Sequence, residues 1–169
     1  MALFKNDGFI ADEWRALAED EDIPLDGKVM VSLAQWRAGR ERWRAANFPI
    51  GLRLEAGAPV QDIAPDLARF TLISIDFPKF SDGRGFSMAR LIRRTEGFAG
   101  ELRAVGDVLF DQLQHMARCG FDAFEIKDAA TIRLLEAGRR PGLGLFYQPA
   151  ASSDETAEPS RPWARRAAR

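Results

Sequence analysis

Short apolar segments recur along this chain at intervals of about 20 to 30 residues, and this cadence limits the possible folds more than any other feature. The segments begin near positions 29, 50, 71, 101, 121 and 143. Between them lie stretches with helical spacing of apolar side chains, or turn signals at glycine and proline. Steps of this length are typical of βα units, whose crossover connections keep successive strands parallel.

The expected fold is therefore α/β, with repeated βα units forming a mainly parallel sheet of about five or six strands. A complete eight-unit barrel needs about 250 residues, whereas this chain has 169. The cadence leaves two architectures open, an open sheet and a partial TIM-barrel-like sheet. The clearest strand is TLISIDF (71–77), because its nearly continuous apolar character is typical of a strand covered on both faces.

Three parts are expected along the chain. Residues 1–27 are acidic and predict an irregular N-terminal arm, residues 28–149 predict a single α/β domain, and residues 150–169 predict a disordered tail because they are small, polar and proline-containing. The start of the chain does not resemble a secretory signal, and no apolar run approaches the roughly 18 residues of a membrane span. We therefore expect a cytoplasmic protein without membrane contact.

Composition excludes several kinds of site. The net charge of −1 gives no reason to expect a nucleic-acid partner. With one cysteine and one histidine, this chain alone supplies neither a disulfide nor the thiolate set of a zinc or iron–sulfur site. No metal site is expected, and a flavin remains open as a cofactor.

The carboxyl ends of the strands are the expected place for chemistry, since parallel α/β folds bind ligands there. Asp76 ends the apolar run 71–77, and Asp107 follows the next predicted strand. A carboxylate at such a position is a candidate acid or base, so these two are the candidate catalytic residues. The alternatives are structural: Asp76 pairs with Lys79 or Arg84, and Asp107 caps the helix that follows it.

The loop after the third predicted strand, SDGRG, is a candidate anion-binding site made of Ser81, Asp82, Gly83, Arg84 and Gly85. Glycines permit unusual backbone angles, backbone N–H groups at a helix start attract anions, and an arginine can bind an oxyanion through two bonds. The loop matches neither nucleotide-binding fingerprint of glycine-rich loops. The alternative is a tight strand-to-helix turn without a ligand.

Two further sets of side chains stand out in the predicted helices. Arg90, Arg93 and Arg94 form a basic patch that predicts a partner-binding surface, with a solvated helix face as the alternative. His115 and Cys119 are four residues apart and could form a nucleophilic pair. Packing in the core is the favoured interpretation of Cys119, because buried cysteine is a common small core residue.

Three motifs, FPKFSDGRGFSMARLIRR, GELRAVGDVLFDQ and RCGFDAFE, occur in this order. Together they resemble the bacterial family of domain of unknown function 934, over about residues 48–148. The resemblance implies a probable oxidoreductase involved in sulfite reduction that accompanies assimilatory sulfite reductase. It brings no catalytic residues to assign.

The resemblance and the composition together lead to two functional expectations. The first is an accessory or partner protein of assimilatory sulfite reduction, in the sulfur assimilation that serves cysteine biosynthesis, with sulfite reductase or another enzyme of that pathway as its partner. The alternative is a small oxidoreductase of the same pathway that binds a flavin or an oxyanion at the strand ends. A homodimer is also expected, because a partial sheet leaves an edge to be covered.

Overall fold

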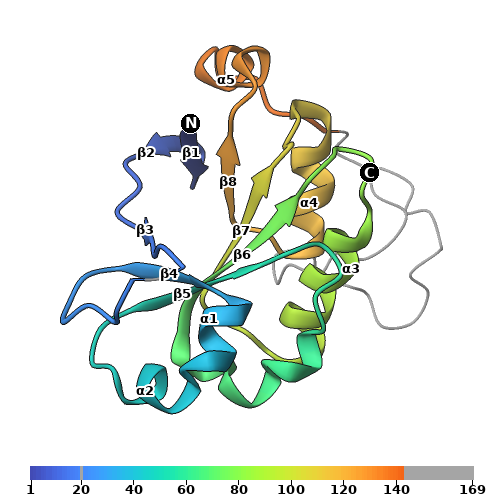
Figure 1. Ribbon diagram of the computed structural model, residues 1–169. Helices are drawn as coiled ribbons and strands as arrows, with labels where there is room; N and C mark the ends of the chain where they lie inside the picture. The colour runs from blue at the N-terminus through green and yellow to red at the C-terminus, as the bar shows by residue number, and fades with distance from the viewer. Residues whose placement is uncertain (20, 143–169) are drawn as a thin grey trace.

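The computed structural model describes residues 1–19 and 21–142, and Figure 1 shows one curled, mostly parallel sheet with helices packed against it. The described residues form an eight-stranded sheet in the order β2-β1-β8-β7-β6-β5-β4-β3. Only β1 pairs antiparallel, with β2 and β8. The strands are β1 Ala2–Lys5, β2 Gly8–Ile10, β3 Arg15–Ala16, β4 Val29–Ser32, β5 Ile50–Leu54, β6 Phe70–Phe77, β7 Glu101–Gly106 and β8 Ala123–Ile126.

Strands β3 to β8 take consecutive places in the sheet, so each βα unit is added in the same direction. Right-handed crossovers then place the connecting helices on one face, as Figure 1 shows for α1 to α4. This is the winding of a barrel segment, whereas a doubly wound sheet reverses direction. The helical elements are α1 Leu33–Ala38, α2 Arg40–Ala45, η1 Val60–Asp62, η2 Ala64–Arg69, α3 Arg84–Arg90, η3 Leu91–Thr95, η4 Phe110–Gln112, α4 Leu113–Cys119 and α5 Ala129–Glu136.

The main core lies between the sheet and the helices. On β6, Ile73, Ile75 and Phe77 are fully buried and belong to this core. The ring of Phe77 packs edge-on against Phe86 of α3, with centroids 5.2 Å apart. A methyl group added at Gly85 would lie 2.5 Å from Phe77 Cζ, so α3 approaches the sheet this closely only because position 85 has no side chain.

A buried carboxylate joins α1 and α2 to the turn before β6. Asp66 accepts hydrogen bonds from Trp36 Nε1 (3.0 Å), Arg40 Nε (2.6 Å) and Arg44 Nε (2.8 Å), and we call these four residues the Asp66 cluster. Burial alone would raise the pKa of Asp66, but the hydrogen bonds from Arg44, Arg40 and Trp36 outweigh it and hold that pKa below its ordinary value.

The other face of the sheet, here called the strap face, carries a central row of polar side chains. The pairing register places Ser32, Arg53, Ser74 and Arg103 in one row across β4 to β7. The side chain of Arg103 is 1% exposed and pairs with Glu101 on its own strand (2.8 Å). The buried cation of Arg103 needs further partners on that face, because a buried charge without partners is costly.

Another partner comes from residues 11–14, here called the strap. The strap connects β2 at one end of the sheet to β3 at the other. Asp12 accepts a hydrogen bond from Arg103 Nη1 at 2.7 Å. Trp14 packs over β5, where a methyl group at Gly51 would lie 3.2 Å from its ring. The strap therefore crosses the strap face and covers it.

The structure corrects several expectations. The arm 1–27 is not irregular, because it supplies β1, β2 and β3, so the sheet has more strands than predicted. Gly39 separates α1 from α2, and the short helices η1 and η2 occupy most of the segment between β5 and β6. The apolar segment that begins near 143 and the tail lie outside the described residues. No helix in ranges 1–19 and 21–142 is long and apolar enough to cross a membrane.

Candidate functional site

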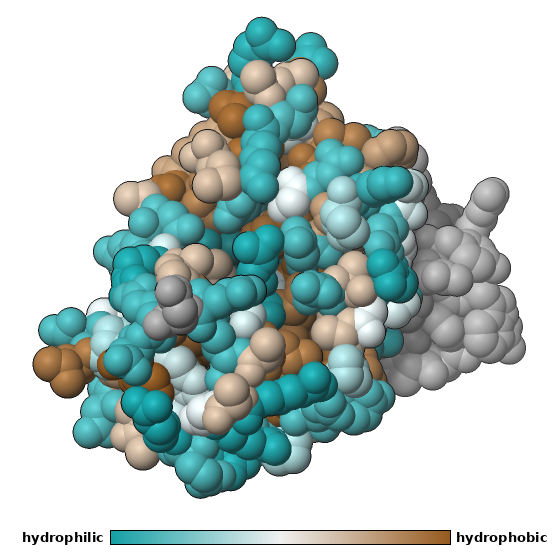
Figure 2. Space-filling view, viewed as in Figure 1, coloured by the Kyte–Doolittle hydropathy of each residue, from teal (hydrophilic) through white to brown (hydrophobic). Residues whose placement is uncertain are grey.

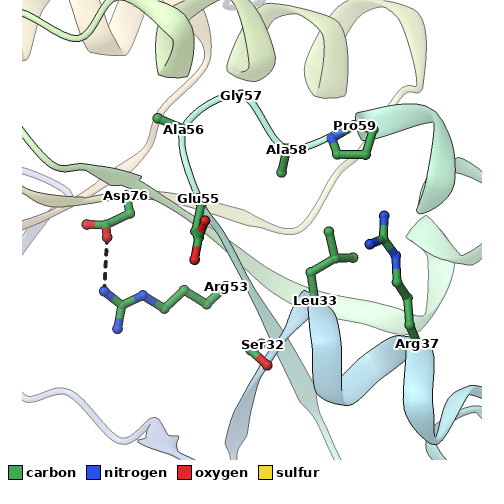
Figure 3. Close-up of a pocket in the computed structure, with 10 residues that line it drawn as sticks. All are labelled: Ser32, Leu33, Arg37, Arg53, Glu55, Ala56, Gly57, Ala58, Pro59 and Asp76. Atoms are coloured by element: carbon green, nitrogen blue, oxygen red, sulfur yellow. Dashed lines mark hydrogen bonds and ion pairs between the residues drawn. The ribbon is translucent and has the colours of Figure 1, made fainter.

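A cleft of about 520 Å³ opens at the carboxyl ends of β4, β5 and β6, and we call it the β4–β6 cleft. Its size falls in the range of about 300–1,000 Å³ that is usual for small-molecule sites. This is also the edge at which barrel-like α/β proteins bind ligands. Figure 3 shows the lining residues: Ser32, Leu33, Arg37, Arg53, Glu55, Ala56, Gly57, Ala58, Pro59 and Asp76.

Local structure fixes the walls of the cleft. Ser32 ends β4 and caps α1 through a capping box, in which its hydroxyl accepts from Gln35 N (3.1 Å) and Gln35 Oε1 accepts from Ser32 N (2.8 Å). The loop after β5 turns at Gly57, whose φ of +89° favours glycine. The backbone N–H of Gly57 points to Met88 Sδ at 3.0 Å, which ties this loop to α3.

Two cations and two carboxylates face this cleft. Arg53 Nη2 contacts Asp76 Oδ2 at 3.2 Å, and their side chains are 49% and 27% exposed. Arg37 pairs with Asp62, which is not a lining residue. Glu55 has no ion-pair partner within the part of the chain that the structure describes. In Figure 3, Arg37 stands at one end of the cleft beyond Leu33, while Arg53, Glu55 and Asp76 gather at the other end.

The two candidate catalytic carboxylates have different surroundings. Asp76 lines the cleft, and its partner is Arg53 on the neighbouring strand rather than the expected Lys79 or Arg84. Asp107 instead fixes the loop after β6, because its Oδ2 accepts a hydrogen bond from Phe80 N at 2.8 Å.

Asp107 therefore does not cap the next helix, since η4 begins at Phe110 and α4 at Leu113. Gln112 donates from Nε2 to Phe80 O at 2.7 Å, so both backbone polar groups of Phe80 are held by side chains of the next βα unit. The structure thus assigns Asp107 and Gln112 to positioning this loop.

In the SDGRG loop, the guanidinium of Arg84 donates to both oxygens of Asp82 (3.0 and 2.7 Å). These bonds from Arg84 hold the pKa of Asp82 at about 2. Arg84 also lies against Gly57, where a methyl group would be 3.0 Å from Nη1, so the loop stands directly behind the cleft. Ser81 and Gly83 are exposed, and Gly85 is buried against the core. An anion at this loop would compete with Asp82 for Arg84, and anion binding here stays a prediction.

The expected arginine surface is divided. Arg93 is only 15% exposed at its side chain, and its guanidinium donates to the carbonyl oxygens of Phe98, Gly100 and Gly120 and to Asp122. It therefore joins η3 to the loop before β7 and to the loop before β8. Arg90 and Arg94 are exposed, so the prediction of partner binding applies to these two.

His115 and Cys119 do lie close together, with Sγ 3.8 Å from Nε2. However, Cys119 is 2% exposed, and burial raises the pKa of its thiol, which disfavours the reactive thiolate. The ring of His115 packs against Phe86 at 4.8 Å. Within the described ranges, no group of three or more His, Cys, Asp or Glu residues is arranged to hold a metal ion.

Sequence reasoning missed Arg37 and Arg53 as members of the site. A signal for Arg53 was present, because it is the only charged residue of the strand IGLRL and lies two residues before Glu55. Period-two alternation places both on one face of the strand. For Arg37 we find no comparable signal in the sequence.

Comparison with known proteins agrees with the motif resemblance. The model of a family described as "Bacterial protein of unknown function (DUF934)" matches residues 51–157, which is more than half of the chain. No curated protein and no solved structure matches. The matched region contains Arg53, Glu55 and Asp76 of the cleft and all of the SDGRG loop. The chain therefore belongs to the bacterial DUF934 family.

Proposed function

We propose that this protein is an accessory protein of assimilatory sulfite reduction, in the sulfur assimilation that serves cysteine biosynthesis. The motif resemblance supports the pathway. The observation that carries the accessory role is the state of the single thiol: Cys119 is buried, and its thiol pKa is raised. Iron–sulfur clusters need several thiolates, so an iron–sulfur relay of electrons belongs to a partner.

A partner surface is supported by Phe80. Its side chain is among the exposed large hydrophobic ones at 55%, while its backbone is held at both polar groups by Asp107 and Gln112. Figure 2 shows a largely hydrophilic face with apolar side chains in small groups. An exposed aromatic on a fixed backbone is a good anchor, because few residues carry most of the binding energy of an interface.

Affinity purification from bacteria grown on sulfate tests the accessory role. We expect sulfite reductase, or another enzyme of sulfur assimilation, to be enriched with this chain and lost in a mock purification. Phe80→Ala and Arg90→Glu should each weaken the purified complex by about tenfold or more. Arg133→Glu on α5, also exposed, is the matched control and should leave it unchanged. Recovery of the chain without any such enzyme would refute the proposal.

The β4–β6 cleft favours a second candidate, a small oxidoreductase of the same pathway that binds a flavin or an oxyanion. Arg37 and Arg53 are the groups that would receive a phosphate or sulfur oxyanion. The test is a visible spectrum of the purified protein, together with thermal shifts on adding flavins, sulfite or adenylylated sulfate. A colourless protein that none of these compounds stabilises would remove this candidate.

A further inference from the structure

We infer that the β4–β6 cleft binds an α-amino acid with an anionic side chain. The α-ammonium group would lie at Glu55 and Asp76, the α-carboxylate at Arg53, and the side-chain anion at Arg37. This inference gives the cleft a different ligand class from the flavin or oxyanion of the second candidate above. It is independent of the accessory role, since Phe80 and Arg90 are not among the lining residues.

The charges of the cleft carry the argument. Arg53, Glu55 and Asp76 gather at one end, where two carboxylates outnumber one guanidinium. Such an end suits a headgroup with one cation and one anion. It disfavours a simple oxyanion, which would meet Arg53 together with two negative charges. Arg37, beyond Leu33, offers a separate positive group at the other end.

The groups at the acidic end have free capacity for a ligand. A guanidinium has five N–H donors, and Arg53 uses one in its single 3.2 Å contact with Asp76. The backbone carbonyl of Glu55 accepts a hydrogen bond from Ala58 N at 3.0 Å. Its side-chain carboxylate has no hydrogen bond or ion pair to another described residue, so the carboxylate oxygens are available to an ammonium group. A bidentate bond from Arg53 to an α-carboxylate would leave Asp76 and Glu55 facing the adjacent α-ammonium.

At the other end, Arg37 forms an ion pair with Asp62 but can still bind the anionic group of a ligand. Their side chains are 51% and 48% exposed, and exposed pairs of this kind contribute little to stability. The lining between the two ends includes Leu33, Ala58 and Pro59, which suit the methylene groups of a side chain. An acidic or sulfonate side chain would thus reach Arg37 past an apolar surface.

Isothermal titration with glutamate, cysteate, glutamine, glutamate α-methyl ester, N-acetylglutamate and sulfite tests this inference. We expect glutamate or cysteate to bind at least about tenfold more tightly than glutamine and than either blocked derivative. Each blocked compound lacks one charge of the headgroup, so the comparison reports recognition of the ammonium and of the carboxylate separately.

Two variants assign the ends of the ligand. Glu55→Gln should weaken all the amino acids together by about tenfold. Arg37→Gln should abolish the preference for glutamate over glutamine, so that the two bind about equally, while binding of the headgroup is kept. The exposed α5 changes Glu136→Gln and Arg133→Gln are matched controls and should alter neither quantity.

Three results would overturn the inference. One is equal binding of glutamate and N-acetylglutamate. Another is binding of sulfite that Glu55→Gln strengthens and that amino acids do not displace, which would identify a simple anion site. The third is no binding of any amino acid at concentrations up to about 10 mM. Co-purification of a reductase is unaffected by all three results, so failure here is distinguishable from failure of the accessory role.

Discussion

Removal of the buried charge on Arg103 should loosen the strap from the sheet. Arg103 lies on β7 with 1% of its side chain exposed, and its guanidinium contacts Glu101 Oε1 at 2.8 Å and Asp12 Oδ2 at 2.7 Å. Arg103→Met keeps an unbranched stem of similar shape and removes the cation. Two carboxylates then lose the charge that holds them on the strap face.

The cost follows from what each carboxylate can do next. Removing one partner of a buried pair costs about 3–5 kcal/mol. Glu101 keeps Lys5 at 2.7 Å, and the side chain of Asp12 is 35% exposed and can turn to water. The lower end, roughly 3 kcal/mol, is therefore expected. For a domain of this size that loss lowers Tm by about 6–12 °C.

Urea and thermal unfolding, monitored by circular dichroism, measure the loss of stability. Hydrogen exchange shows which strands are destabilised. Exchange should accelerate in β1 to β3 before it does in β5 to β7. Asp12→Asn removes only the charge of Asp12 and should cost less, about 1 kcal/mol. Adding it to Arg103→Met should cost almost nothing further, because the two residues share one contact.

Arg42→Met is the matched control for this experiment. Arg42 is exposed on α2, so the same substitution should stay within about 0.5 kcal/mol of the parent protein. An Arg103→Met protein that unfolds within about 2 °C of the parent, with unchanged exchange in β1 to β3, would refute this account of the strap.

Two further predictions concern the side of the sheet that the helices cover. Asp66 has a lowered pKa, so its stabilising effect is complete above the unfolded value of about 3.9 and is lost as pH falls through the folded value. Urea midpoints should therefore fall below about pH 4 in the parent protein and fall less steeply in Asp66→Asn, and parallel pH curves would contradict this. Gly85→Ala should cost about 1–3 kcal/mol, because the new methyl group meets Phe77 at 2.5 Å, whereas Gly83→Ala has open space and should be nearly neutral. Equal urea midpoints for the two glycine variants would contradict the packing role of Gly85.

The sequence predicts the central strands well and the first three not at all, for a physical reason. Strands β4 to β8 lie in apolar segments that pack on helices, so composition alone locates them to within a few residues. Strands β1, β2 and β3 have four, three and two residues, and their pairing depends on distant partners. Local patterns do not contain that information.

The candidate site was predicted in part. Asp76 was placed correctly at a strand end and lines the cleft, but its pairing with Arg53 depends on the register between β5 and β6, which the sequence does not show. The role of Arg93 was hidden for a similar reason, since its four acceptors come from two loops that are about 20 residues apart in the sequence. The sequence identifies a charged side chain, but it does not identify the groups that this side chain contacts in the fold.

The position of β1 in the sheet has a consequence for the order of folding during synthesis. Residues 2–5 pair with residues 123–126, so the strand that leaves the ribosome early waits for the strand that leaves about 120 residues later. The units β4 to β7 can assemble in between through local crossovers, while closing so long a loop has a larger entropy cost. Docking of β1 and the strap is therefore the step that completes the sheet, and changes near Met1 act on this late step rather than on nucleation.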